Sequence, residues 1–520
     1  NNNTAVGDQA LSLMTTASDN TAVGRSSLKI NTTGTSNVAV GKDSLSLNTE
    51  GDNNTAVGKN SLYANQTADN NTAIGTASLV TNTTGFNNTA VGNSALANNT
   101  TGHDLIAVGC GALYCNTTGP DNIAIGYQSQ YNTTTGCQNV SMGWQSMAGN
   151  LTGDGNTALG FKALYTNNGS TPDFNVAVGR QALYSTTSGY RNVGIGLNAM
   201  YTTTTGYANV GIGPNVLYSN TTGYENVAIG QCALYANISG VENTAIGCGA
   251  LRSSQTATAN TAVGRAALGK NTSGLRNVAL GRNAMCANTT ASDNVAIGFQ
   301  ALCTNTTGID NVAVGRNALF ASTTGTGGNV AVGMCTAVGI TTGCFNTIIG
   351  KNAGTSLTTP EGNTFIGKSA GCNAVSGNNN TTLGINAGID GVKNITGTDT
   401  HNIVIGNNGN TNAYIKIDWT VTSDLRDKTN IENVPYGLNF INQITPIKYD
   451  FKTSREDETP NGTKKYGFSA QEILALEGDN PVIIDNHDLE NLKITGGHLL
   501  PVLVNAVKEL TKRIKDLEDK

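Results

Sequence analysis

Near the C-terminus, Ser423 and Lys428 stand five residues apart, with Arg426 between them. A serine hydroxyl becomes a good nucleophile when a neighbouring base takes its proton. A lysine amine can be that base once burial or a nearby cation lowers its pKa from about 10.4. A spacing of five puts the two side chains on different faces of a regular helix, so the pair needs a turn or a site completed by a neighbouring chain. Taken alone, the segment fits an exposed Ser-Asp helix cap and a solvated Arg-Lys run better.

Other potentially reactive residues are scattered through the first 420 positions. Ten cysteines lie between Cys110 and Cys372, and their spacing matches neither a paired zinc site nor a compact disulfide framework, so we predict no metal. Cys286 and Cys303 occupy equivalent positions in two successive sequence repeats and could stack, and we favour a reduced pair over a disulfide. We predict no cofactor. Single carboxylates are expected to serve solvated turns and not as the pair that a glycosidase needs; they are Asp52, Asp104, Asp121, Asp154 and Asp173.

The composition separates two parts of the chain. Only 12% of the residues are charged and 64 are glycine, and residues 421–520 hold 30 of the 65 charged side chains. This shift marks a domain boundary. The net charge of −5, without clustered Lys or Arg, argues against a nucleic-acid partner, and the lack of an apolar run of about 20 residues argues against membrane insertion. Because the chain starts at Asn1, inside a repeat, we expect it to be a fragment or a processed product.

A 17-residue repeat accounts for most of the chain. A core of the form Asn-Thr/Val-Ala-Val/Ile-Gly first ends at Gly7 and occurs 24 times up to Gly406, and 20 of the 23 intervals between successive core glycines equal this period. The pattern predicts a β-solenoid in which each repeat forms one coil. The opening Asn is present in 23 of the 24 cores, and we favour a side-chain ladder along the solenoid over a local turn bond.

Strand alternation predicts which side chains fill a coil. In the repeat that begins at Asn88, alternation places Thr89 and Val91 on one face and Ala90 and Gly92 on the other. We expect the larger pair to point inward with Leu96, and the small face to lie against a neighbouring chain. Threonine pairs in the turns could project a regular array, as ice-binding solenoids do, but turn stabilisation explains them more simply.

The pattern changes towards the C-terminus and divides the chain into segments. Residues 1–333 form the regular shaft. In residues 334–410, larger groups move from one segment of the coil to another, which predicts a differently packed neck. Residues 411–422 alternate as a linking strand, and residues 423–520 have ordinary globular patterning. Within the last part, residues 500–520 show the 3-4 apolar spacing of a coiled coil; its positions are Leu500, Leu503, Val507, Leu510, Ile514 and Leu517.

Two families resemble these segments. The Asn-x-Ala-Val/Ile-Gly core over residues 1–333 resembles the head repeats of trimeric autotransporter adhesins, which implies a β-roll that associates in threes. The run that starts Ser423-Asp424-Leu425-Arg426-Asp427-Lys428-Thr429-Asn430-Ile431 resembles the S-D-x-R-x-K-x-N-I signature of the endosialidase-type intramolecular chaperone. Further matches in order are Gly437 to Ile441, Gly467 to Glu472 and Leu500 to Val504.

The second resemblance implies self-cleavage by a Ser-Lys dyad. Ser423 would be the nucleophile, Lys428 the base and Thr422-Ser423 the bond that is cut. Asp424, Arg426 and Asn430 would complete the motif.

We therefore expect an all-β shaft, a trimeric parallel β-solenoid, followed by a small α+β chaperone domain that ends in a coiled-coil helix. The expected function is that of a structural or adhesive fibre, a viral tail fibre or tailspike shaft, whose only catalysis is its own processing. Expected partners are two further copies of the chain, a glycan or protein receptor on the host surface, and other virion tail proteins. The expected location is the virion, assembled in the host cytoplasm, with the extracellular surface as the alternative. Alternative functions are a glycan-degrading tailspike with its catalytic domain upstream and a bacterial surface adhesin.

Overall fold

The computed structural model describes residues 2–167, 173–325, 327–390, 392–410, 423–452, 455–479, 481–487 and 489–520. The chain divides into two compact units, Asn1–Asn363 and Thr364–Lys520. The boundary between the units falls inside the predicted neck, residues 334–410. The predicted linking strand, residues 411–422, lies outside the described residues.

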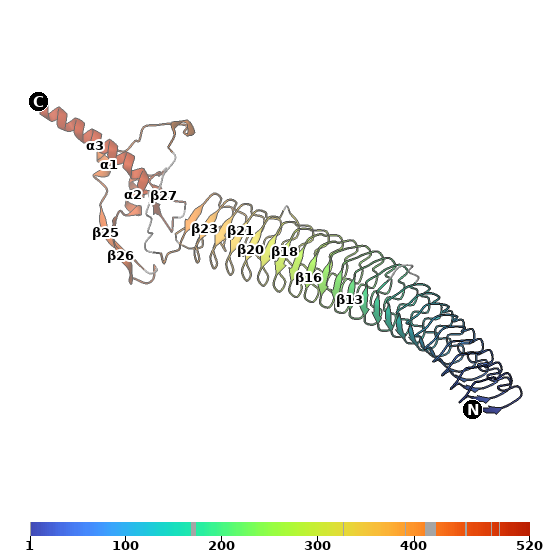
Figure 1. Ribbon diagram of the computed structural model, residues 1–520. Helices are drawn as coiled ribbons and strands as arrows, with labels where there is room; N and C mark the ends of the chain where they lie inside the picture. The colour runs from blue at the N-terminus through green and yellow to red at the C-terminus, as the bar shows by residue number, and fades with distance from the viewer. Residues whose placement is uncertain are drawn as a thin grey trace. The chain divides into compact units, whose positions relative to one another are not determined.

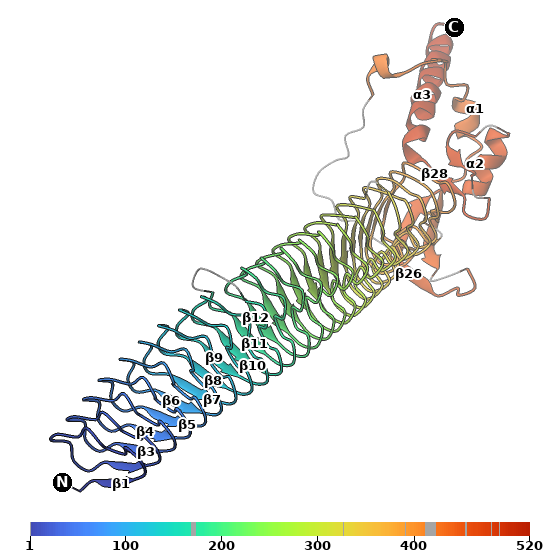
Figure 2. The same cartoon turned by 90° about the vertical axis from the view of Figure 1, so that its right-hand side faces the viewer.

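The first unit is a stack of 17-residue coils, each with one three-residue strand (Figures 1 and 2). Successive strands pair in parallel and in register, so that Ala90 lies beside Ala73 and Ala107. The strands of this unit are β1 (Thr4–Val6), β2 (Thr21–Val23), β3 (Val38–Val40), β4 (Thr55–Val57), β5 (Thr72–Ile74), β6 (Thr89–Val91), β7 (Ile106–Val108), β8 (Ile123–Ile125), β9 (Val140–Met142), β10 (Thr157–Leu159), β11 (Val176–Val178), β12 (Val193–Ile195), β13 (Val210–Ile212), β14 (Val227–Ile229), β15 (Thr244–Ile246), β16 (Thr261–Val263), β17 (Val278–Leu280), β18 (Val295–Ile297), β19 (Val312–Val314), β20 (Val330–Val332) and β21 (Thr347–Ile349). The predicted parallel β-solenoid is confirmed.

The interior of each coil corrects one prediction. Ala90 and Leu96 are completely buried, whereas Thr89 and Val91 are only partly buried and point outward. The alternation was right, but its inward face was assigned wrongly. A 17-residue coil is narrow, and its two opposed walls leave room for a leucine facing an alanine but not for a leucine facing β-branched residues. The small face therefore fills the coil instead of lying against a neighbouring chain.

Two backbone features keep the coils this tight. Leu96 has φ 53, in the left-handed region that a bulky side chain seldom adopts, and the equivalent leucines share this conformation. The conformation turns the side chain into the coil, where burial offsets the strain. Gly92 has φ 137, and a Cβ there would lie 2.5 Å from the carbonyl oxygen of Gly109 in the next coil. The core glycine is thus required by the close approach of successive backbones.

The predicted asparagine ladder is present. Asn71 Oδ1 accepts a hydrogen bond from the backbone N–H of Asn88 at 3.0 Å, and Asn71 Nδ2 donates to the carbonyl oxygen of Gly85 at 3.0 Å. A second ladder, which we did not predict, runs eleven positions after the first, where Asn99 Nδ2 donates to Asn82 Oδ1 at 2.9 Å. Each buried amide therefore ties its own coil to a neighbour.

The outward strand positions form a continuous apolar row, which we call the outer stripe. Val91 belongs to it, and many members are more than a third exposed. The more exposed members in the first unit are Val6, Val23, Val38, Val40, Val57, Ile74, Ile106, Val140, Met142, Ile212, Ile229, Ile246, Leu280, Ile297 and Ile349. An exposed apolar row of this length marks an interaction surface.

The second unit begins with three further coil strands, β22 (Thr364–Ile366), β23 (Thr381–Leu383) and β24 (Ile403–Ile405). Here the inward residue of the strand is large. Phe365 is completely buried, and a Cβ on Gly371, which takes the place of the leucine, would clash with the Phe365 ring. At this coil, large and small residues have exchanged places across the same interior.

The rest of the second unit is a small α+β fold. Its elements are η1 (Leu425–Asp427), α1 (Leu438–Ile441), β25 (Ile447–Lys452), β26 (Pro460–Gly467), α2 (Ala470–Glu477), β27 (Ile484–Asp485), β28 (Lys493–Ile494) and α3 (Gly496–Glu518). Strands β25 and β26 pair antiparallel, as do β27 and β28. The core consists of Phe440, Ile444, Ile473, Ile483, Ile484, Leu499 and Val502.

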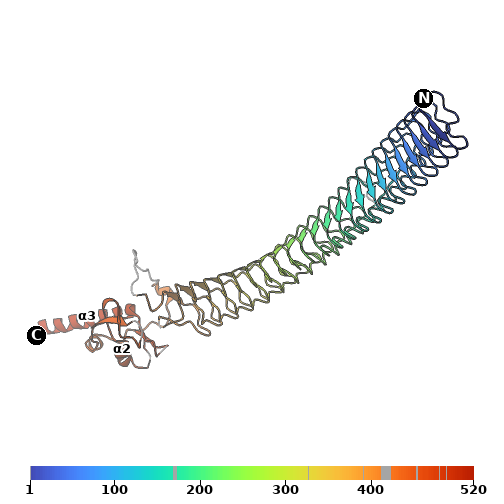
Figure 3. The same ribbon diagram turned by 90° about the horizontal axis from the view of Figure 1, so that it is seen from below.

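Helix α3 is the last element of the chain (Figure 3), and its side chains form two apolar faces. Leu499, Val502 and Ala506 are buried in the fold's own core. The predicted coiled-coil residues instead remain exposed, from 40% at Leu503 to 71% at Leu517. The helix ends at Glu518, two residues before the end of the predicted segment, residues 500–520. The predicted terminal helix is confirmed, and its second face is available to other chains.

Candidate functional site

The Ser423 segment folds as a tight turn. Asp424 caps the 3-10 helix η1 by accepting a hydrogen bond from the backbone N–H of Arg426 at 2.9 Å, and Lys428 follows the last helical residue in an extended conformation. The cap predicted for a Ser-Asp pair is therefore formed, with Asp424 as the capping residue. Because the helix lasts only three residues, the chain reverses in time to bring position 428 back to position 423.

This turn places the predicted dyad within hydrogen-bonding distance. Lys428 Nζ lies 2.9 Å from Ser423 Oγ and donates a second hydrogen bond to the Ser423 carbonyl oxygen at 3.3 Å. These distances suit proton transfer between the hydroxyl and the amine. Thr422, on the other side of the predicted scissile bond, lies outside the described residues.

The surrounding residues of the motif make contacts that the sequence did not predict. Arg426 forms an ion pair with Asp424, with Nε 3.1 Å from each carboxylate oxygen, and this contact lowers the pKa of the Asp424 carboxyl. Arg426 is therefore paired, and its positive charge is largely offset locally. Asn430 adopts φ 51, which asparagine tolerates better than most residues, and helps to turn the chain away from the site.

Ser423 and Lys428 are both exposed in the chain as described. An exposed dyad has its nucleophile and base in position but lacks the dry surroundings in which a lysine gives up its proton. The geometry can support acyl transfer to Ser423 Oγ once another surface covers it. We expected a turn or a site completed by a neighbouring chain, and the turn is present.

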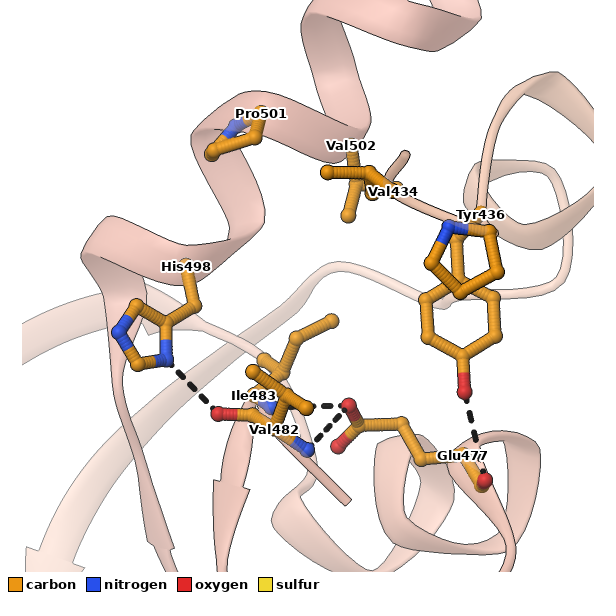
Figure 4. Close-up of a pocket in the computed structure, with 9 residues that line it drawn as sticks. Val434, Tyr436, Glu477, Val482, Ile483, His498, Pro501 and Val502 are labelled. Carbon is orange, nitrogen blue, oxygen red and sulfur yellow. Dashed lines mark hydrogen bonds between the residues drawn. The ribbon is translucent and has the colours of Figure 1, made fainter. Parts of the chain in front are cut away.

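An apolar pocket of about 250 Å³ lies elsewhere in the same fold (Figure 4). At its base the buried Glu477 carboxylate accepts hydrogen bonds from the backbone N–H groups of Val482, Ile483 and Ile484, at 2.8–3.0 Å. Tyr436 donates its hydroxyl hydrogen to the Glu477 carbonyl oxygen at 3.3 Å. These bonds hold the loop after α2 in place, so the carboxylate has a structural role.

The carboxylates of the shaft serve turns, as predicted, with one exception. Asp52 Oδ1 accepts from the Thr35 backbone N–H at 2.6 Å, and Asp154 Oδ1 accepts from that of Cys137 at 2.8 Å. Asp104 bonds to Asn87 at 3.0 Å, and Asp121 lies exposed in the corresponding turn.

Asp173 is the exception because it is completely buried. Its Oδ2 accepts hydrogen bonds from Asn156 and Asn167, taking the place of a backbone carbonyl in the ladders. Burial raises the pKa of this carboxyl.

Cysteine and threonine side chains follow the same stacking. Cys286 and Cys303 lie on adjacent coils with their Sγ atoms 2.7 Å apart. The hydrogen bond from Cys303 lowers the pKa of Cys286 to about 7.

Thr83 Oγ1 donates to the Thr100 carbonyl oxygen at 3.0 Å, so turn hydroxyls bond along the shaft, which supports the turn role over an ice-binding array.

Sequence reasoning missed a set of aromatic columns. Tyrosines that follow the buried leucine stack from coil to coil, as Tyr165 and Tyr184 do at 5.1 Å between ring centroids. A second column places Trp144 5.0 Å from Phe161. The signal was available, because the tyrosines of the first column recur at one repeat position in nearly every coil between residues 114 and 235. Their spacing matches the rise of one coil.

The described residues include no group of three or more His, Cys, Asp or Glu side chains that is arranged to hold a metal ion. Of the helices in the described part of the chain, none has the length and hydropathy to cross a bilayer.

Comparison with known proteins gives one result, at the C-terminal region. Residues 423–480 match the peptidase S74 family, described as chaperone of endosialidase, and the match begins at Ser423. No curated protein and no solved structure matches the chain. A domain of this family implies assistance to the folding and trimerisation of a fibre-like solenoid, together with self-cleavage. The chain therefore combines a β-solenoid of 17-residue repeats with a C-terminal region that matches the chaperone-of-endosialidase family over residues 423–480.

Proposed function

We propose that this chain is a homotrimeric structural fibre whose C-terminal domain aligns three chains and then releases itself by cutting the Thr422-Ser423 bond. The observation that carries the proposal is the 2.9 Å contact between Lys428 Nζ and Ser423 Oγ, at the first residue of the family match.

The cleavage follows from the position of Ser423 beside the bond. The neutral Lys428 amine takes the Ser423 hydroxyl proton, and Oγ attacks the carbonyl carbon of Thr422. The C–N bond then breaks, the Ser423 nitrogen leaves as an amine after taking a proton, and an ester links Thr422 to Ser423 Oγ. Water hydrolyses the ester, which leaves a carboxylate on Thr422 and a free amine on Ser423.

Assembly would activate the site. The dyad is exposed and Arg426 is paired with Asp424, so the described chain offers neither the burial nor the free cation that favours a neutral lysine. A neighbouring chain packed over the turn would supply burial. Cleavage would then be restricted to chains that have already assembled.

Two apolar surfaces support contact between copies of the chain, and the family match supports the number three. The exposed face of α3 has the spacing of a coiled coil, and the outer stripe offers a row of β-branched side chains along the shaft. Identical coils could also pair one coil out of register. A clamp at the C-terminus would set the register, and its removal would leave a kinetically stable fibre.

We further propose that the fibre belongs to a virion, is assembled in the host cytoplasm, joins other tail proteins and contacts a host-surface receptor. The endosialidase-chaperone match supports this assignment because it links the chain to a class of assembly domain. The coils themselves support a structural role, since buried asparagines such as Asn71 and Asn82 hydrogen-bond from coil to coil in the ladders.

Replacement of Ser423 by alanine tests the cleavage. The wild-type chain should yield a product that ends at Thr422, whereas Ser423→Ala and Lys428→Ala should remain at full length in intact mass spectra. Thr429→Ala, an exposed neighbour, is the matched control and should be processed like the wild type. A Ser423→Ala product that is still cut before residue 423 would refute the assigned nucleophile.

A further inference from the structure

One ring is missing from the tyrosine column of the shaft. Tyr114 and Tyr131 stack at 5.0 Å, and the column resumes with Tyr165, Tyr184 and the tyrosines that follow. The coil between Tyr131 and Tyr165 carries Ala148 and then Gly149 in place of a ring and its neighbour. The rings of Tyr131 and Tyr165 are therefore two coil steps apart, and each step is about 4.8 Å.

The gap is not caused by a distortion of the backbone. Asn132 donates its backbone N–H to the Ala148 carbonyl oxygen at 3.1 Å, and Gly149 donates to that of Tyr165 at 2.8 Å. The coils thus keep their regular spacing through the gap. A ring placed midway would lie about 5 Å from each tyrosine, which is the stacking distance that the column itself uses.

The opening is a pocket of about 260 Å³, lined by Gln128, Tyr131, Asn132, Gln145, Ala148, Gly149 and Tyr165. This volume lies a little below the range of about 300–1,000 Å³ for drug-sized ligands. It suits a ligand of one or two rings. The pocket lies on the segment that follows each strand, so its residues are not those of the outer stripe.

Amide groups line the pocket beside the two rings. Gln145 Nε2 donates to Gln128 Oε1 at 2.8 Å, which orients both side chains. This bond does not use the Gln128 amide hydrogens or the Gln145 side-chain oxygen, so these atoms can serve a ligand in the pocket that both residues line. Hydroxyl groups both donate and accept hydrogen bonds, so an amide pair of this kind matches a ring that carries several hydroxyls.

A cation lies next to Tyr165, one of the two rings that flank the gap. Lys162 follows Gln128 and Gln145 at the equivalent repeat position, and its Nζ is 5.0 Å from the Tyr165 ring centroid and 5.2 Å from that of Trp144. These aromatic contacts hold the ammonium group between the two columns. It can therefore meet an acidic substituent on a ring that occupies the gap.

We propose that this gap is a saccharide-binding site, in which one pyranose ring stacks between Tyr131 and Tyr165 and hydrogen-bonds to Gln128 and Gln145. The C–H bonds of a pyranose face carry a slight positive charge and suit the negative faces of two tyrosine rings. A purely aromatic ligand would stack on the two tyrosine rings but would make no hydrogen bonds with Gln128 and Gln145. The proposal does not rest on self-cleavage, because every residue of the site belongs to the coils of β8, β9 and β10.

The test titrates the assembled protein with the methyl glycosides of glucose, galactose, N-acetylglucosamine and N-acetylneuraminic acid, followed by saturation-transfer NMR and calorimetry. At least one glycoside should bind. Ala148→Tyr supplies the missing ring and should weaken that binding more than tenfold, while Arg252→Tyr, which extends the column at its far end, should leave it unchanged. Gln145→Leu, a second variant that leaves the rings in place, should weaken binding about tenfold. Lys162→Met should weaken only the acidic glycoside.

Three results would overturn the proposal. They are no binding of any glycoside at millimolar concentration, equal binding by the wild type and folded Ala148→Tyr, or N-acetyltryptophanamide binding in the gap more tightly than every glycoside. The last result would indicate an aromatic peptide side chain as the ligand. Running the titration on both wild type and Ser423→Ala separates this test from that of the proposed function, since the pocket is present in each.

Discussion

The shaft coils and the C-terminal fold bury their apolar side chains in different ways. In a shaft coil, Leu96 meets its partners within its own coil or one coil away, and the same contact recurs from repeat to repeat. In the C-terminal fold, Phe440, Ile473 and Val502 come from three separate elements to make one core. The first arrangement needs only local pairing, whereas the second needs a unique tertiary structure.

The two regions also leave different kinds of apolar surface exposed. The shaft leaves its outer stripe partly exposed along the whole first unit, and α3 leaves one face exposed over about five helical turns. Repetition makes the first surface identical from coil to coil, so it cannot fix a register. Helix α3 occurs once in the chain and its sequence is not repeated, so it can fix the register. Specificity of assembly should therefore come from the C-terminal region.

The largest effect on assembly and folding is expected when the two apolar faces of α3 are substituted separately. Leu510→Asp alters the exposed face, where Leu510 is 46% exposed, and should convert the proposed trimer to monomers without unfolding the domain. Because the cleavage site would stay uncovered, processing should also fail. Val502→Asp alters the buried face and should instead unfold the domain. Native mass spectrometry and circular dichroism distinguish the two, and a trimer of Leu510→Asp would contradict the proposed clamp.

A smaller effect, on the stability of a single coil, is expected from substitutions in its interior. Ala90→Phe places a ring against Leu96 and should lower the local unfolding free energy by about 3 kcal/mol, at the upper end for overpacking. The double change Ala90→Phe with Leu96→Gly reproduces the Phe365–Gly371 arrangement and should recover at least half of the loss. Amide hydrogen exchange over residues 88–104 measures both. Equal loss in the single and double variants would show that the two positions do not share one interior space.

Removal of one ladder side chain should lower the unfolding free energy by less than the overpacked coil does. Asn71→Ala leaves the Asn88 backbone N–H without its acceptor, and we expect a loss of about 2 kcal/mol in the unfolding free energy of the adjacent coils. Asn98→Ala, at a partly exposed position off both ladders, is the control and should change stability by less than about 0.5 kcal/mol. Thermal unfolding that does not distinguish the two variants would argue against the ladder as a stabilising element.

The smallest effect concerns the stacked thiols. Since the hydrogen bond from Cys303 lowers the pKa of Cys286 to about 7, alkylation of Cys286 should rise as the pH increases through 7. Cys303→Ala removes the donor and should shift this rise to higher pH, without a measurable change in stability. Mass-spectrometric mapping of iodoacetamide adducts follows both curves. An unchanged midpoint in Cys303→Ala would show that another group sets the reactivity of Cys286.

Much of this fold could be predicted because one short pattern is repeated many times. The regular spacing of the core glycines predicts one coil per repeat, and the recurrent Asn predicts a ladder. The inward face of the strand could not be settled by alternation alone, since Ala90 and Val91 lie on opposite faces in either arrangement. The interior width decides it, and that width depends on Leu96 facing the strand across the coil.

The site was predictable for a different reason. The Ser423 to Asn430 motif has a specific residue order, so a resemblance carries the positions of Ser423 and Lys428 even where local spacing favours a helix cap. The Arg426–Asp424 pair was not foreseen, because sequence alone does not show which of several neighbouring charges will meet. The aromatic gap at Ala148 was missed because a single alanine at one repeat position has no evident meaning until the tyrosines at the equivalent positions are seen to stack.

The in-register stacking has a consequence for how such a gene can change. Because each strand meets the equivalent strand of the next repeat, loss or duplication of a whole repeat joins two surfaces that already fit. A change of any other length must be absorbed in a turn. Recombination between repeats could thus lengthen or shorten the solenoid in fixed increments, while the C-terminal segment proposed to direct assembly stays untouched.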